Sequence, residues 1–144
     1  MEKTMRVIVF VKATEDSEAD AMPTPELIDA MGKYNEQLVN AGIMIGGDGL
    51  KSSKNGKRIA FNGDGREVID GPFAETRELV AGFWIWEVRD MAEAMEWAKR
   101  CPNPMPGPSE LEIRPVITME DFAPVITEEQ LARDAALRVR VDAR

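Results

Sequence analysis

Three charged side chains within one short stretch could carry proton-transfer chemistry. Asp70 ends an apolar run, Gly-Pro-Phe follows it, and Glu75 and Arg77 come soon after. A carboxylate in an apolar setting has a raised pKa and can act as a general acid or base near neutral pH. Asp70 is therefore the candidate catalytic residue. Arg77 presents a fork of donors that suits a carboxylate or enolate oxygen of a ligand, and Glu75 lies on the same side if this stretch is extended.

The same stretch has a purely structural interpretation. Asp, Gly and Pro are residues that β-turns favour, and Phe73 would anchor such a turn in the core. Glu75 and Arg77 would then form an exposed ion pair, which adds little stability. The sequence leaves the catalytic and the structural interpretation open.

Further residues are candidates for contacts with a ligand. An indole ring would line one side of a site for a compact apolar or aromatic ligand. The hydroxyl of the single tyrosine could donate a hydrogen bond to such a ligand. However, this tyrosine lies on an apolar helix stripe, which is more typical of a core residue. Asp48 lies among glycines that are not followed by the helix of a P-loop, so phosphate binding is not expected there. The candidate ligand-binding residues are Tyr34, Asp48, Phe73, Glu75, Arg77, Trp84 and Trp86.

Composition excludes several classes of function. The 144 residues contain no histidine and one cysteine, Cys101, so Ser-His triads and His-ligated zinc sites are excluded, and we expect neither a metal site nor a cofactor. The net charge of −8 disfavours binding to nucleic acid or to an anionic membrane. A lone cysteine fits a reducing compartment, and no segment has the ~20 apolar residues of a membrane span. We therefore expect a cytoplasmic protein.

The hydrophobic pattern predicts how the candidate residues are positioned. Thr24-Pro25 begins a helix that Gly42 ends, and Asp90 caps a second helix. Residues 13–23 are expected to be a loop, and Asn55-Gly56 a hairpin turn. A second turn lies at 62–65, within a hairpin-rich insertion over residues 50–69. The strands are expected at 5–12, 43–45, 58–61, 67–69, 80–88 and 111–116, and a capping box at Thr127 and Gln130 begins a C-terminal helix.

This order predicts an α+β fold of the ferredoxin-like, split βαβ type, with an inserted β-hairpin. Two helices can cover only one face of a four-stranded sheet. Apolar residues on both faces of the central strands therefore predict a homodimer in which two sheets pack together. We expect the second face to be formed by Ile8, Phe10, Trp84, Trp86 and Val88.

The stretch Asp70-Gly71-Pro72-Phe73-Ala74-Glu75-Thr76-Arg77-Glu78 resembles the signature of the DGPF group within the YCII-related domain family. The upstream Gly47-Asp48-Gly49-Leu50 and the spacing to Trp84 and Trp97 fit the same pattern. The resemblance covers about residues 5–122, so we expect one domain over 1–122 and a helical extension over 123–144. It implies a mostly bacterial protein that forms a dimeric α/β barrel with a cleft in each subunit.

The resemblance also implies two classes of function. The wider family contains small-molecule enzymes of lyase or isomerase type, some thought to use a His-Asp pair, which this chain cannot form. The first expectation is thus a homodimer that binds a small molecule, with acid–base chemistry at Asp70 and Arg77. The alternative is a non-catalytic regulatory or protein-interaction module, since some DGPF proteins resemble domains associated with sigma factors.

Overall fold

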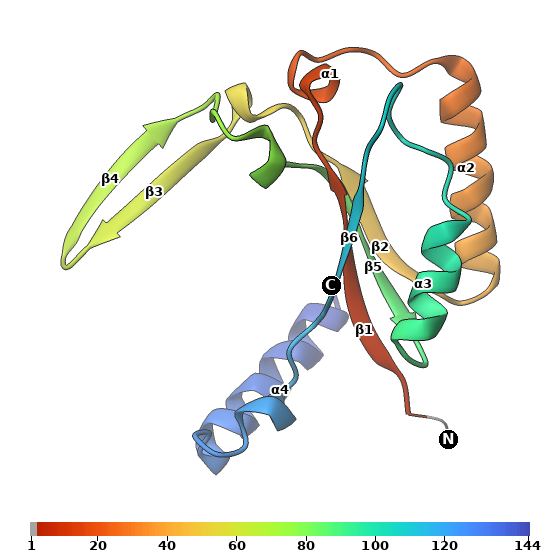
Figure 1. Ribbon diagram of the computed structural model, residues 1–144. Coiled ribbons are helices and arrows are strands. Elements are labelled where there is room, and N and C mark those ends of the chain that lie inside the picture. Colours follow the sequence, from red (N-terminus) through yellow and green to blue (C-terminus); the bar gives the residue numbers. More distant parts are fainter. Residues whose placement is uncertain (1–2) are drawn as a thin grey trace.

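The protein contains a four-stranded antiparallel sheet and a separate two-stranded hairpin. A computed structural model describes residues 3–144 (Figure 1). The large sheet has the strand order β2-β5-β1-β6, and the hairpin pairs β3 with β4. Both sheets are open, so residues 3–144 of a single chain close no barrel. The strands are β1 (Met5–Lys12), β2 (Met44–Gly49), β3 (Lys57–Asn62), β4 (Gly65–Asp70), β5 (Val80–Val88) and β6 (Leu111–Pro115).

Four α-helices accompany these strands in the described part of the chain: α1 (Glu15–Glu18), α2 (Pro25–Asn40), α3 (Met91–Lys99) and α4 (Glu128–Asp142). The predicted caps are confirmed. Thr24 accepts a bond from Leu27 N, and Asp90 accepts one from Glu93 N. Gly42 follows α2 with φ +72°, a conformation that glycine adopts without strain. Helices α2 and α3 lie on the same side of the large sheet (Figure 1).

The core lies between the large sheet and helices α2 and α3. Its side chains come from alternate positions of β1 and β5 and from the inner faces of the two helices, as the period of two in a strand requires. The alternate residues Met5, Val7, Val9 and Val11 of β1 face this core. The buried core residues are Val7, Val9, Tyr34, Leu38, Ile43, Trp84, Trp86, Val88 and Ala94.

The prediction that Trp84, Trp86 and Val88 belong to the second face of the sheet is wrong. Trp84 pairs with Val9 and Trp86 with Val7, so both indoles point into the helix-covered core. Directly paired residues of neighbouring strands share a face, and the sequence alone did not give this register. The other face carries Ile8 opposite Ile85 and Phe10 opposite Phe83, all half-buried. We call these four residues the open-face cluster.

Three local predictions are also wrong. Residues 15–18 of the expected loop form α1, because Thr14 and Ser17 make a reciprocal capping box. Asn55-Gly56 does not form a hairpin turn, since residues 53–55 are a 3₁₀ turn. The strand expected at 43–45 instead continues through the glycines after Ile45, as β2. A Cβ at Gly47 would lie 2.9 Å from Trp84 Cδ1 and 2.7 Å from Phe83 O, so glycine lets this strand lie against the indole.

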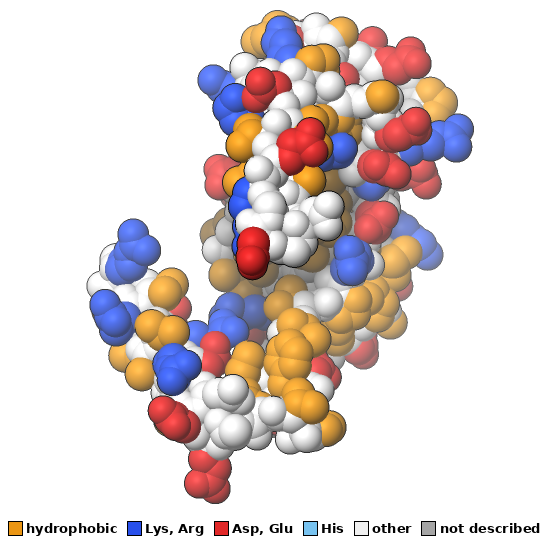
Figure 2. Space-filling view, turned by 90° about the vertical axis from the view of Figure 1, so that its left-hand side faces the viewer, with side chains coloured by type: hydrophobic (Ala, Val, Ile, Leu, Met, Phe, Trp, Pro, Cys, Tyr) orange, Lys and Arg blue, Asp and Glu red, His pale blue; other side chains and the backbone are white. Residues whose placement is uncertain are grey.

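The β3–β4 hairpin and α4 project from the side of the sheet opposite to α2 and α3 (Figure 1). The hairpin is confirmed as the main part of the predicted insertion, with Gly63 at φ +57° in its turn. Figure 2 views the molecule from this side. It shows a hollow between the hairpin and the C-terminal segment, with hydrophobic side chains at its floor.

Candidate functional site

The segment from Asp70 to Arg77 runs from the end of the hairpin to the start of β5. Asp70 is the last residue of β4, and Lys57, opposite it on β3, donates to the Asp70 carboxylate at 2.5 Å. The Asp70 side chain is 72% exposed. Glu75 and Arg77 are exposed and make no ion pair with any residue from 3 to 144. The three charged groups thus share one exposed segment, and only Asp70 is paired.

Gly71 and Phe73 attach this segment to the base of the hairpin. Gly71 N donates to Gly56 O at 3.0 Å, and a Cβ at Gly71 would lie 1.7 Å from Ser53 O. Phe73 is half-buried, and the Arg58 guanidinium lies 3.8 Å from the centroid of its ring. The structural interpretation therefore accounts for the glycine and the phenylalanine of this stretch, and leaves Glu75 and Arg77 without such an explanation.

A hydrogen-bonded group that the sequence did not indicate holds the same base to α1. The Glu18 carboxylate accepts from Ser53 N at 2.9 Å and from Ser53 Oγ, and Ser53 Oγ accepts from Phe73 N at 3.0 Å. Glu18 lies 35 residues before Ser53. No local pattern links residues so far apart, and Glu18 lay in a segment expected to be a loop.

A second acid of the same region strengthens this attachment. Asp20 forms an ion pair with Lys54. Hydrogen bonds from Lys54 and then from Ser52 hold the pKa of the Asp20 carboxyl below its usual range. The side chain of Ser52 is itself buried, with 6% of the residue exposed. The hairpin base is thus tied to residues 18–20 by both acids.

Tyr34, Trp84 and Trp86 form an aromatic cluster in the core, away from solvent. Tyr34 and Trp84 pack edge to face at 5.9 Å between ring centroids, and Trp84 and Trp86 are also 5.9 Å apart. Tyr34 donates to Trp97 O at 2.7 Å, and burial raises the pKa of its hydroxyl. Trp84 Nε1 donates to Asn35 Oδ1 at 2.9 Å. Two of the three polar groups are therefore satisfied inside the protein.

Trp86 is the exception. The residue is fully buried, and its Nε1 is the one buried side-chain nitrogen or oxygen in residues 3–144 without a hydrogen-bond partner. Neither Trp84 nor Trp86 is therefore exposed as the expected wall for a ligand. Asp48 is exposed on β2 and pairs with Phe83, which places it at the border of the open-face cluster.

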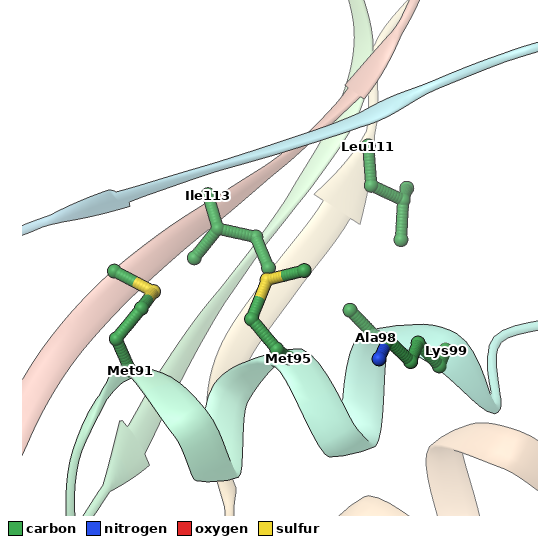
Figure 3. A pocket seen from close by; sticks show the side chains of 6 residues that line it. All are labelled: Met91, Met95, Ala98, Lys99, Leu111 and Ile113. Carbon is green, nitrogen blue, oxygen red and sulfur yellow. The ribbon is translucent and has the colours of Figure 1, made fainter.

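An apolar groove lies between α3 and β6 (Figure 3). Its volume is about 330 Å³, and Met91 and Met95 of the helix point toward Leu111 and Ile113 of the strand. Lys99 is the charged residue in its lining. The groove contains none of the candidate site residues, and it is open to solvent.

Nowhere in residues 3–144 do three or more acidic or cysteine side chains gather in a way that could hold a metal ion. No helix in that range combines the length and apolar character needed to cross a bilayer. Burial raises the pKa of the Cys101 thiol to about 11, which keeps it protonated at neutral pH.

Comparison with known proteins relates this chain to one protein family. Over 49 residues it is 39% identical to an uncharacterized protein of Rhizobium meliloti (strain 1021); the match covers 34% of this chain and 40% of the relative. This chain therefore spans less than half of the relative's length in that match. The sequence profile of the YCII-related domain matches residues 5–120, which include the whole large sheet, the hairpin and the Asp70–Arg77 segment. The chain belongs to the YCII-related domain family.

Proposed function

We propose that the protein is a homodimer of ferredoxin-like domains that binds a small anionic molecule beside the Asp70–Arg77 segment. The observation that carries the dimer is the open-face cluster of Ile8, Phe10, Phe83 and Ile85. The order β2-β5-β1-β6, with α2 and α3 on one face, supports the ferredoxin-like arrangement. Two such sheets packed face to face would complete an α/β barrel.

The surroundings of the open-face cluster suit a subunit interface. Arg6 pairs with Glu87, Ile8 with Arg114 and Phe10 with Glu112, so charged residues of both signs surround the apolar centre. An apolar centre with a polar rim is typical of protein interfaces. Charges of both signs let a second copy of the same face pair with the first in a two-fold arrangement.

The chemistry of the site rests on the charged residues that the turn does not need. Arg77 binds a carboxylate or enolate oxygen of a compact ligand, and Glu75 assists it. Asp70 moves the proton, and Lys57 holds its carboxylate in place. Such a set suits proton transfer next to a carbonyl, as in a lyase or isomerase reaction.

A second candidate function is a non-catalytic module for protein interaction. The observation in its favour is the exposed apolar surface of residues 116–142, which includes Ile117, Val125 and Val139, 58%, 79% and 69% exposed. Ligand binding separates the two candidates. A small molecule that binds at Arg77 supports the first, and a chain that binds none supports the second.

The homodimer predicts a large effect of one charge on the open face. We expect the wild-type protein to sediment at twice the 16.0 kDa of the chain at micromolar concentration. Ile85→Asp places a carboxylate in the apolar centre, where burial without a partner costs several kcal/mol. The variant is expected to sediment as a folded monomer. Ile28→Asp on α2 is the control, because Ile28 is 59% exposed on the other side of the sheet. A wild-type monomer at 100 µM would contradict the proposal.

The ligand site predicts separate effects of Arg77 and Asp70. In titration calorimetry against a panel of small ring-containing carboxylates, Arg77→Ala is expected to weaken binding by about 2 kcal/mol, roughly thirtyfold. Asp70→Asn is expected to bind the ligand as the wild type does. It is expected to lose the exchange of protons between the ligand and solvent, which NMR measures. Both variants should change the free energy of unfolding by less than about 0.5 kcal/mol, because both side chains are exposed.

The control for this experiment is Asp64→Asn at the hairpin turn, an exposed acid outside the site. It is expected to bind like the wild type. If Arg77→Ala and Asp64→Asn bind every carboxylate with equal affinity, Arg77 has no part in ligand binding.

A further inference from the structure

We infer that the hairpin and the C-terminal segment are two arms that hold a second copy of this chain, so that the Asp70–Arg77 site lies at the boundary between subunits. The hairpin arm is residues 57–70, and the C-terminal arm is residues 116–142. The inference rests on the proposed homodimer and adds which parts of one subunit contact the other.

The hairpin arm presents an apolar face that its own chain does not cover. Every residue of β3 and β4 is exposed. Ile59 pairs with Val68 and Phe61 with Arg66, which places Ile59, Phe61 and Val68 on one face; they are 57%, 72% and 61% exposed. An isolated two-stranded hairpin is at best marginally stable in water. This arm therefore requires a surface against which to pack.

The C-terminal arm also presents apolar side chains that its own chain does not cover, here on a helix. No residue of α4 is buried, and its large hydrophobic side chains Leu131, Leu137, Val139 and Val141 are 46%, 47%, 69% and 60% exposed. Residues 3–144 expose eighteen large hydrophobic side chains, and twelve of them lie on the two arms. Exposed apolar surface is thus concentrated on the side from which the arms project (Figure 2), a concentration typical of interaction sites.

Charge favours a second copy as the occupant. The hairpin arm has three basic residues (Lys57, Arg58, Arg66) and three acidic ones (Asp64, Glu67, Asp70) and is therefore neutral, whereas the C-terminal arm has three basic and six acidic residues. The whole chain carries −8, and two such chains repel each other. The hairpin arm is therefore a surface on which an identical acidic chain can approach without this repulsion.

Position supports the same occupant. The open-face cluster lies at the same side of the sheet as the two arms (Figure 1). A second subunit whose sheet covers this cluster would lie in the hollow between the arms of the first subunit. By two-fold symmetry, the arms of the second subunit would then contact the first subunit. The hollow, the cluster and the arms then form one continuous interface.

The base of the hairpin arm fixes the direction in which the arm projects. The bonds from Ser53 to Glu18 and from Phe73 to Ser53, together with the Lys54–Asp20 ion pair, hold it to the domain. The Asp70–Arg77 segment follows directly from the arm. A partner subunit that contacts the arm therefore lies next to Asp70 and Arg77. It would line the side of the ligand site that the buried Trp84 and Trp86 cannot line.

The test places a photo-crosslinking benzophenone amino acid at position 61 of the hairpin arm or at position 139 of the C-terminal arm. Irradiation of the purified full-length protein is expected to give a covalent dimer from both positions. Met22, 86% exposed, is the control position and is expected to give none. The double substitution Ile59→Ser, Phe61→Ser is expected to raise the dimer dissociation constant at least tenfold, and Val39→Ser, equally exposed at 58% on α2, is expected to leave it unchanged.

The possible failures are distinguishable. If the wild type sediments as a dimer, Ile85→Asp abolishes the dimer, and neither arm position gives a covalent dimer, the arm inference is overturned and the sheet-to-sheet dimer stands. If position 61 crosslinks in cells only to a different protein, the hairpin arm serves another partner and the inference is overturned. If the wild type is a monomer, both the proposed homodimer and the inference about the arms are overturned.

Discussion

Replacing Trp86 by alanine is expected to lower the free energy of unfolding by about 3–5 kcal/mol. Trp86 is fully buried, and Val7 and Met44 pair with it across the two neighbouring strands. Removal of the indole leaves a large cavity that a close-packed core cannot collapse to fill. Because a domain of ordinary size has only ~5–15 kcal/mol of stability, the melting temperature should fall by roughly 10 °C or more. Chemical denaturation followed by far-UV circular dichroism measures the loss.

This prediction distinguishes a core residue from an interface residue. The indole belongs to the core of a single chain, so the difference in melting temperature from the wild type should be the same at low and high protein concentration. Trp97→Ala is the matched control. Trp97 is half-buried with Arg100 over its ring, and its loss should cost less. An effect of Trp86→Ala that grows on dilution would place this indole at the subunit contact instead.

Replacing Gly71 by alanine is expected to release the hairpin from the domain. The added Cβ would lie 1.7 Å from Ser53 O and 2.7 Å from Ser53 C, and both are backbone atoms that no side-chain rotation can move away. A steric conflict of this kind costs about 1–3 kcal/mol or more, which corresponds to a roughly tenfold to hundredfold higher population of the open hairpin. The amide protons of Gly71 and Phe73 should exchange with solvent faster by the same factor.

Gly107→Ala is the control for this experiment, because a Cβ at Gly107 meets no atom within 4 Å. The core amides of β1 and β5 should keep their protection in both variants, since the hairpin lies outside the main sheet. Unchanged protection of the hairpin in Gly71→Ala would show that the contacts with Ser53 do not hold the arm.

Local sequence is sufficient to predict the long strands, the three longer helices and their N-terminal caps. β1 and β5 are long apolar runs, and a run of this kind forms a strand wherever a sheet can bury it. Thr24, Asp90 and Thr127 begin helices because their side chains satisfy backbone N–H groups within three residues. The hairpin at 62–65 follows from its glycines. These interactions are local in sequence, so the pattern of residues contains them. The family could also be identified at this level.

The face of the sheet that the indoles occupy depends on tertiary packing, and so do the contacts of the Asp70–Arg77 segment. The face depends on the register between β1 and β5, and a shift of one residue exchanges the two faces. The Gly71 and Phe73 contacts depend on Ser53 and Glu18, which lie far away in sequence. The exposure of the arms likewise depends on where α2 and α3 pack. Such contacts join distant residues through the packing of the whole chain, and no short stretch of sequence encodes them.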